Sequence, residues 1–157
     1  MANPRHSPTT GFLVWRLSMK WRAAVDRAVA PLGLTHAQYS MLASLYGMTR
    51  TDQTPSQREL ADFTGLEPIY VSKLARALER AGLVERAENP TDTRAVVLTL
   101  TRQGTTVVKQ AIAIVSDLLD ELTAPLGGQR GPETRALVAT LQTLLAVPTP
   151  ETTGVNS

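Results

Sequence analysis

The chain has 157 residues, 43% of them apolar and 19% charged, and this composition predicts one folded domain. It contains no cysteine, which excludes disulfides, thiolate metal sites and thiol redox switches. The net charge is only +2, and residues 56–103 carry seven basic and seven acidic side chains, so bulk charge alone predicts no nucleic-acid partner. No apolar run approaches the ~20 residues of a membrane span, and the first residues lack a secretory signal, so a cytoplasmic location is expected. Residues 1–10 and 148–157 are expected to be flexible tails.

Two helices are predicted in the first third of the chain. Residues 11–30 form an amphipathic pattern whose apolar members recur at spacings of three and four. These members are Val14, Leu17, Trp21, Val25 and Ala28. A proline and a glycine end this helix, and a second helix begins at Thr35, which makes a capping box with Gln38. Residues 47–55 are expected to form a polar connector.

A pair of short helices follows, predicted at residues 56–63 and 68–80. Ser56 with Glu59 makes a second capping box, and Gly65 permits the left-handed backbone that ends such a helix. The apolar members are Leu60, Ala61 and Phe63 on the first helix and Val71, Leu74, Ala75 and Leu78, as an inward stripe, on the second. Two helices joined through a tight turn with a glycine are typical of a helix-turn-helix motif.

The hydrophobic period then changes from helical to alternating. Residues 83–87 and 95–100 predict the two strands of a hairpin, with turn residues between them at 88–93. A helix that Thr101 caps is expected to reach residue 123, and a last helix spans residues 132–146. A two-stranded hairpin is only marginally stable alone, so this one must pack on the helices.

These elements predict a mainly α fold with a small β-hairpin wing, in a single domain of residues 11–147. Residues 35–100 form a winged helix-turn-helix lobe. Residues 11–31 and 101–147 form a helical dimerisation region, because their apolar stripes exceed what the lobe of one chain can cover. The alternative is packing of these helices within one chain.

The second helix of a helix-turn-helix motif enters the major groove of DNA. Its outward face is expected to carry Ile69, Ser72, Lys73 and Arg76 at spacings of three and four, flanked by Tyr70. Lysine and arginine reach guanine edges or phosphates, serine contacts either, and isoleucine can touch a thymine methyl. The alternative is an ordinary solvated helix face with two cations.

The tip of the predicted hairpin holds Asp92, Thr93 and Arg94. An arginine on a narrow hairpin is shaped to enter the minor groove, whose negative potential attracts it. Asp92 is expected to fix the direction of the guanidinium through a charge-assisted bond. The alternative is a solvated ion pair at a turn, which has little energetic value.

Five segments in this order resemble the MarR family of winged-helix regulators, named for multiple antibiotic resistance. They are GLTHAQY at 33–39, SQRELA at 56–61, LERAGLVER at 78–86, DTR at 92–94 and LTLTRQG at 98–104. The resemblance covers residues 11–147. It implies a dimer built from the first, fifth and sixth helices, a recognition helix at 68–80 and a wing tipped by Arg94. One departure is Thr93, where the family usually has a basic residue, so affinity is expected to depend more on Lys73 and Arg76.

The resemblance further implies a repressor of transcription that releases duplex DNA when a small, often phenolic, molecule binds. The predicted DNA contacts are Ser56, Gln57, Pro68, Ile69, Tyr70, Ser72, Lys73, Arg76, Asp92 and Arg94. No catalytic residue, metal or cofactor is expected. A twofold dimer predicts a pseudo-palindromic operator with half-sites about 10 base pairs, or ~34–36 Å, apart.

A pocket for the small molecule is predicted where the first and second helices meet the DNA-binding lobe. It combines apolar walls with a few polar groups, as ligand pockets do. Its candidate residues are Trp15, Arg16, Met19, His36 and Tyr39. The alternative for Trp15 and Met19 is plain core packing, and for His36 a place beside a helix cap.

Two other classes of protein are alternatives for this sequence. An enzyme would need catalytic groups, and the only acid cluster of note is Asp117, Asp120 and Glu121 on one helix, where a solvated face is the simpler interpretation. A winged-helix module for protein–protein contact, without specific DNA binding, agrees with the balanced charge of residues 56–103. Steep weakening of DNA binding by salt would distinguish a DNA-binding protein from such a module.

Overall fold

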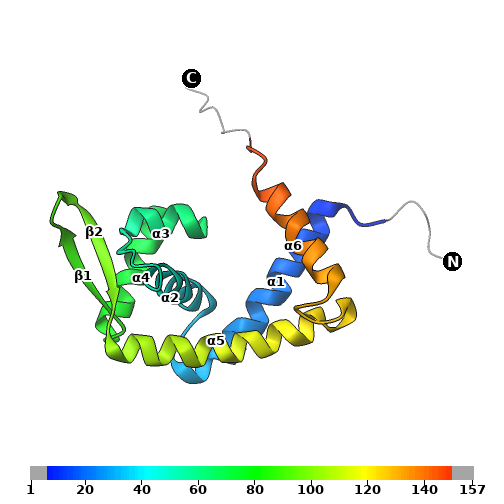
Figure 1. The fold of residues 1–157 in the computed structure, drawn as a ribbon, viewed down its shortest axis with the longest axis horizontal. Helices are drawn as coiled ribbons and strands as arrows, with labels where there is room; N and C mark the ends of the chain where they lie inside the picture. The colour runs from blue at the N-terminus through cyan, green and yellow to red at the C-terminus, as the bar shows by residue number, and fades with distance from the viewer. Residues whose placement is uncertain (1–6, 150–157) are drawn as a thin grey trace. The chain divides into compact units, whose positions relative to one another are not determined.

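The computed structural model describes residues 7–149, which form helices and one two-stranded hairpin (Figure 1). The elements are α1 (Thr10–Val29), η2 (Ala30–Leu32), α2 (His36–Thr49), α3 (Gln57–Thr64), α4 (Pro68–Arg80), β1 (Val84–Asn89), β2 (Asp92–Leu100), α5 (Arg102–Thr123), η3 (Ala124–Leu126) and α6 (Pro132–Leu145). Two compact units divide within α5, the first ending at Ser116 and the second beginning at Asp117. None of the helices in residues 7–149 is long and apolar enough to cross a membrane. Residues 1–6 and 150–157, which include most of both predicted tails, lie outside the described residues.

Helices α1 and α2 follow the predicted pattern closely at their starts. Thr35 and Gln38 form the reciprocal capping box expected of them. The predicted connector at residues 47–55 begins too early, because α2 continues past Gly47 to Thr49. A glycine costs a helix only about 1 kcal/mol relative to alanine, and the fully buried Leu45 anchors this turn of α2 in the core.

Helix α1 is attached to α2 through its second half. Val25 and Val29 are fully buried, as are Met41 and Leu42 of α2. The carboxylate of Asp26 also accepts a hydrogen bond from the backbone N–H of His36, at 2.6 Å, in the first turn of α2. Because the first N–H groups of a helix have no partner within it, this contact satisfies one of them and joins the two helices.

The helix-turn-helix consists of α3 and α4. Gly65 ends α3 with φ of 74°, a backbone conformation that favours glycine. The inward stripe of α4 is confirmed, since Val71, Leu74, Ala75 and Leu78 are all buried. Two details were wrong. Phe63, counted with the apolar residues of α3, is 67% exposed, because at two positions from the buried Ala61 it lies on nearly the opposite side of the helix. Ser56 with Glu59 makes only half a capping box, in which the Glu59 N–H donates to the Ser56 hydroxyl.

Strands β1 and β2 pair in antiparallel register and extend closer to the tip than predicted. Only Pro90 and Thr91 form the turn, because the Asn89 side chain accepts hydrogen bonds from the backbone N–H and the hydroxyl of Thr91, which closes it tightly. The hairpin packs on the helical motif at its base: the Leu98 N–H donates to the Pro55 carbonyl at 3.1 Å. In Figure 1 it stands beside α3 and α4.

Helix α5 begins under the base of the hairpin. The Thr101 hydroxyl accepts from the Gly104 N–H at 2.9 Å, which confirms its capping role, and donates to the Gly82 carbonyl at 2.6 Å. A Cβ at Gly104 would lie 1.9 Å from the Leu83 carbonyl oxygen, so this approach of α5 to the chain before β1 requires glycine. These contacts fix the base of the wing relative to the start of α5.

In the second unit, α6 begins after a turn rich in glycine. The buried Thr134 donates a 2.6 Å hydrogen bond to the Gly128 carbonyl and holds the turn against the helix. The apolar side chains of α6 and the segment after it remain exposed: Leu137, Val138, Leu141, Leu144, Leu145 and Val147.

Candidate nucleic-acid interface

A groove of about 920 Å³ runs between the start of α3, the start of α4 and the hairpin. It gathers six of the ten predicted DNA contacts: Ser56, Gln57, Pro68, Ser72, Asp92 and Arg94. The other four, Ile69, Tyr70, Lys73 and Arg76, lie on α4 outside the groove lining and are all exposed. The structure therefore divides the predicted contacts between this groove and the outer surface of α4.

The start of α3 forms one wall of the groove. Ser56 is 92% buried, and its hydroxyl is engaged in capping α3. It also forms a β-bridge with Val97, which ties the start of α3 to β2. Gln57 is half-buried beside it, and its Oε1 has no hydrogen-bond partner among the described residues. Ser56 thus holds the wall in place, and Gln57 has unused hydrogen-bonding capacity.

Helix α4 presents two opposite faces. With 100° per residue, Ile69, Lys73 and Arg76 fall within a narrow sector directly opposite the buried stripe. Lys73 and Arg76 are exposed, and no ion pair to either is found in residues 7–149. Both cations therefore extend from this face without a competing carboxylate partner.

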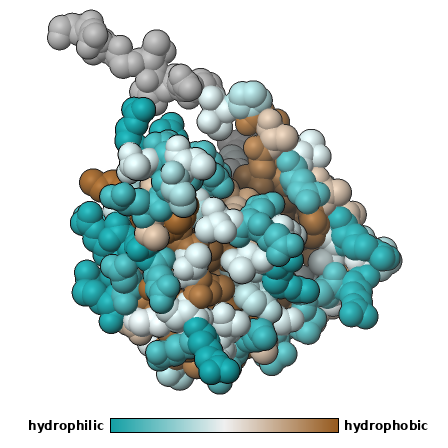
Figure 2. Space-filling model, turned by 60° about the vertical axis from the view of Figure 1, so that its left-hand side comes forward, coloured by the Kyte–Doolittle hydropathy of each residue, from teal (hydrophilic) through white to brown (hydrophobic). Residues whose placement is uncertain are grey.

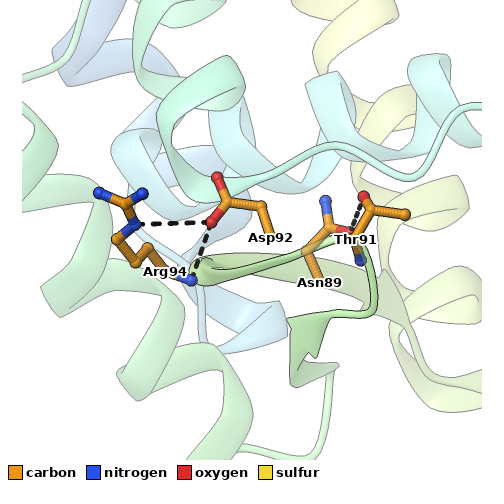
Figure 3. A network of polar contacts seen from close by, with 4 residues as sticks. All are labelled: Asn89, Thr91, Asp92 and Arg94. Carbon is orange, nitrogen blue, oxygen red and sulfur yellow. Dashed lines mark hydrogen bonds and ion pairs between the residues drawn. The ribbon is translucent and has the colours of Figure 1, made fainter.

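The wing tip is organised by short-range polar contacts (Figure 3). The Asp92 carboxylate accepts from the Arg94 backbone N–H at 3.1 Å. Its distance to Arg94 Nε is 3.9 Å, which makes an ion pair and not the charge-assisted hydrogen bond that was predicted. The Arg94 side chain is 95% exposed. Asp92 therefore fixes the backbone that carries Arg94 and leaves the guanidinium extended into solvent.

The hairpin is also joined directly to the recognition helix. The Glu79 carboxylate of α4 accepts from the Arg86 backbone N–H on β1 at 3.3 Å and lies 3.8 Å from the Arg86 guanidinium. Because one carboxylate contacts both the backbone and the side chain of the strand, the wing and α4 are held at a defined angle.

Sequence reasoning missed six residues that line the groove: Arg58, Glu59, Asp62, Asn89, Ala95 and Val96. Arg58 is exposed on the first turn of α3, directly after the predicted contact Gln57, but the sequence alone gives no sign that this turn faces the hairpin. The carboxylates of Glu59, Asp62 and Asp92 outnumber the guanidiniums of Arg58 and Arg94 in the lining. Lys73 and Arg76 of α4 lie outside it, so the unpaired positive charge is concentrated on the outer face of α4.

The surface turned forward in Figure 2 is mostly hydrophilic, with hydrophobic areas interrupted by polar side chains. A polar surface of this kind is expected where the partner is charged and hydrated, whereas a protein partner favours a continuous apolar centre.

The five residues predicted for a small-molecule pocket lie on α1 and on the first turns of α2. Arg16 and Met19 line a shallow hollow of about 510 Å³ with Leu13, Leu17 and Lys20, all on α1. Trp15 is 56% exposed and lies outside the lining of this hollow. The hollow has walls from one helix only, so a ligand here would be covered on one side.

His36 and Tyr39 are half-buried at the start of α2. Burial lowers the pKa of His36 below its ordinary value; the nearby Asp26 carboxylate opposes this effect and Arg22 adds to it. Burial also raises the pKa of Tyr39. Both side chains are therefore favoured in their neutral forms.

The acid cluster of α5 has the arrangement of a solvated helix face. Asp117, Asp120 and Glu121 are exposed, and Asp120 accepts a hydrogen bond from the Gln129 amide at 2.8 Å. Within residues 7–149, no group of three or more histidine, aspartate or glutamate side chains is placed to hold a metal ion.

Helices α3 and α4, the hairpin packed beside them and the groove between them define a winged helix-turn-helix protein. The model of the MarR family matches residues 32–95. A helix-turn-helix transcriptional regulator of Bacillus subtilis (strain 168) is 38% identical over 117 residues, covering 74% of this chain and 78% of the relative. A helix-turn-helix transcriptional repressor of Mycobacterium tuberculosis is 34% identical over 121 residues, covering 73% of this chain and 83% of the relative. The chain belongs to the MarR family.

Solved structures agree with this assignment. A point mutant of MarR from E. coli, in complex with operator DNA, superimposes with a TM-score of 0.72 at 26% identity, covering 87% of this chain and 93% of that one. CouR from Rhodococcus jostii RHA1, bound to p-coumaroyl-CoA, gives a TM-score of 0.76 at 26% identity, covering 91% and 96%.

Proposed function

We propose that this chain is a homodimeric transcriptional repressor that binds duplex DNA at specific sequences and is released by a small aromatic ligand. One observation carries the proposal. The cationic face of α4 and the Arg94 side chain at the tip of the hairpin are both exposed. The contact between Glu79 and Arg86 holds α4 and the hairpin at a fixed angle. A helix and a narrow hairpin arranged in this way are suited to adjacent major and minor grooves.

Each part of the interface has a distinct task in this proposal. Lys73 and Arg76 contact guanine edges or phosphates in the major groove. Arg94 enters the minor groove, and its extended guanidinium needs no rearrangement to do so. Arg58 and Gln57 at the start of α3 donate to the phosphate backbone and set the register. The other predicted contacts, Ser56, Pro68, Ile69, Tyr70, Ser72 and Asp92, border these positions.

A second copy of the chain covers the exposed apolar helices. The first half of α1 exposes 44–56% of each of its large apolar side chains, which are Phe12, Leu13, Val14, Trp15, Leu17 and Met19. Helix α6 of the second unit is apolar and exposed as well. Such surfaces are larger than the scattered apolar residues of a monomer, and burial between two chains removes them from water. The dimer then reads two half-sites about one helical turn apart.

The proposed roles in repression and in ligand binding are extended to this chain from its relatives and structural neighbours. The Mycobacterium tuberculosis relative is a repressor, the E. coli structure holds operator DNA, and CouR holds p-coumaroyl-CoA. We place an effector at α1 and the start of α2, where the five candidates Trp15, Arg16, Met19, His36 and Tyr39 lie, with the partner chain completing the walls. A ligand acts by preferring a different spacing of the two recognition helices. We assign the protein to the cytoplasm and give it no enzymatic role.

The experiment that tests the proposal is a binding titration with a duplex selected from a random pool. Fluorescence anisotropy at increasing salt is expected to show a steep, linear loss of log affinity, because bound cations release counterions from phosphates. Lys73→Ala is expected to reduce the slope by about one for each lysine removed if Lys73 contacts a phosphate. Lys109→Ala serves as the matched control, since Lys109 is an exposed cation of α5 outside the groove lining. Salt-independent binding, or no selected duplex, would favour the protein-interaction module instead.

A further inference from the structure

One apolar side chain interrupts the cationic face of α4. Ile69 is 71% exposed, and no large apolar side chain in residues 7–116 is more exposed. Its spacing of four, seven and eleven residues from Lys73, Arg76 and Arg80 places all four on the same line of the helix. All three cations are exposed. A single exposed isoleucine is unremarkable on an ordinary surface, but this one lies in the first turn, between groove residues Pro68 and Ser72.

The major groove offers Ile69 one suitable contact. The base edges there present hydrogen-bond donors and acceptors, and the 5-methyl group of thymine is the one apolar group that projects into the groove. An isoleucine pressed against a polar edge removes water from that edge and returns no hydrogen bond, which costs binding free energy. Against a methyl group the same burial is favourable on both sides.

This surface differs from the apolar half of α1, where several large side chains gather. The charged neighbours of Ile69 would lose their hydration against an apolar protein partner, whereas phosphates attract them. The occupant that suits both the isoleucine and the cations is therefore duplex DNA with a methyl group in its major groove.

We propose that Ile69 reads the 5-methyl group of one thymine in each half-site, so that it determines base identity at that position. This inference rests on the proposed function, because it requires α4 to lie in the major groove. Lys73 and Arg76 supply attraction to phosphates or guanines, and Ile69 adds selection for thymine without adding charge.

The test replaces each thymine of the selected duplex with deoxyuridine, one position at a time and symmetrically in both half-sites. This change removes only the methyl group. One thymine per half-site is expected to show weaker binding, by about fourfold per methyl and therefore about fifteenfold for the symmetric pair. The ratio of affinities for the thymine and uracil duplexes is the quantity measured.

Two variants assign the effect to Ile69. Ile69→Ala is expected to bring the ratio close to one, and Ile69→Val, which removes a single methylene, to give an intermediate ratio. Arg76→Ala is the matched control, since it weakens binding to both duplexes and keeps the ratio of the wild type. Circular dichroism of each variant checks that α4 is still helical. No loss of helix is expected, because the exposed Ile69 side chain contributes little to the packing of α4.

The outcomes separate the two proposals. A wild-type protein that binds no selected duplex overturns the proposed function. A wild-type protein that binds DNA with no uracil-sensitive thymine overturns only the assignment of Ile69. A uracil effect that persists unchanged in Ile69→Ala also overturns it, because the methyl group would then act through another residue or through the stiffness of the duplex.

Discussion

Two exposed surfaces of the first unit differ in almost every respect. The outer face of α4 carries Lys73 and Arg76 and a single apolar side chain, Ile69. The first half of α1 carries six large apolar side chains that are each 44–56% exposed. Because charged groups keep their hydration until an opposite charge replaces it, the first surface suits DNA. Because apolar groups gain from leaving water, the second suits another copy of the chain.

Helix α1 shows the same contrast within one element. Its second half buries Val25 and Val29 completely against its own chain, whereas its first half buries none of its large apolar side chains. A continuous amphipathic pattern thus has two partners, α2 for one half and, in our proposal, a second protomer for the other. Experiments on these surfaces should therefore give different results: changes on α1 should break assembly, and changes on α4 and the wing should break only DNA binding.

The largest effect is expected from a charge placed in the apolar half of α1. Leu17→Glu buries an unpaired carboxylate in the dimer interface, which costs ~3–5 kcal/mol. Analytical ultracentrifugation should show the dimer dissociating at concentrations at least a hundredfold higher, and operator binding should fall with it. Leu17→Met, which keeps the volume and polarity, is the control. A stable Leu17→Glu dimer would place the dimer interface elsewhere.

The next effect is expected at the wing tip. Arg94→Ala should weaken operator binding by about ten- to a hundredfold, since each half-site loses a charge-assisted contact in the minor groove. Thermal unfolding should not change, because the side chain is 95% exposed. Arg94→Lys should recover part of the affinity, since it keeps the charge. Unaltered affinity of Arg94→Ala would contradict the role given to the wing.

A smaller, position-specific effect is expected on α4. Arg76→Ala should cost ~1–3 kcal/mol and relax selectivity at one base pair if Arg76 reads a guanine edge. Binding to a set of single-substituted duplexes measures this directly. An equal loss on all duplexes would instead assign Arg76 to a phosphate.

The smallest effect depends on pH and concerns the start of α2, where His36 lies beside the second half of α1. Burial lowers the pKa of His36 in the folded state below the unfolded value of 6.5, so the unfolded chain binds more protons as the pH falls. The free energy of unfolding should therefore decrease on acidification from about pH 7.5 through pH 6.5. His36→Gln should show a smaller decrease over this window in urea titrations, and an identical pH dependence in both proteins would remove His36 as its cause.

The sequence predicted best those features that local chemistry determines. The Thr35–Gln38 capping box, the glycine turn after α3 and the inward stripe of α4 are present because caps, left-handed turns and helical periodicity act within a few residues. The strands of the hairpin were predicted too short. The Asn89 side chain closes a tight turn by accepting a hydrogen bond from the Thr91 N–H, and the sequence pattern alone does not show this bond.

The candidate site was only partly accessible to sequence reasoning. The contacts on α4 follow from its helical period, so the sequence placed Lys73 and Arg76 on one face. The groove depends on the packing of β2 against the start of α3, a contact between residues about 40 positions apart, and so Arg58 was missed. In our proposal a second chain completes the effector pocket, and a single sequence contains no measure of what that chain contributes.

The most direct test of the central claim is chemical footprinting of the wild type and Arg94→Ala on the selected duplex. We predict that the wild type protects guanine N7 atoms in two major-groove segments about 10 base pairs apart and the minor grooves beside them. Arg94→Ala, at saturating concentration, should keep the major-groove protection and lose the minor-groove protection. Protection of both grooves by Arg94→Ala, or a wild-type footprint confined to one groove, would contradict the account.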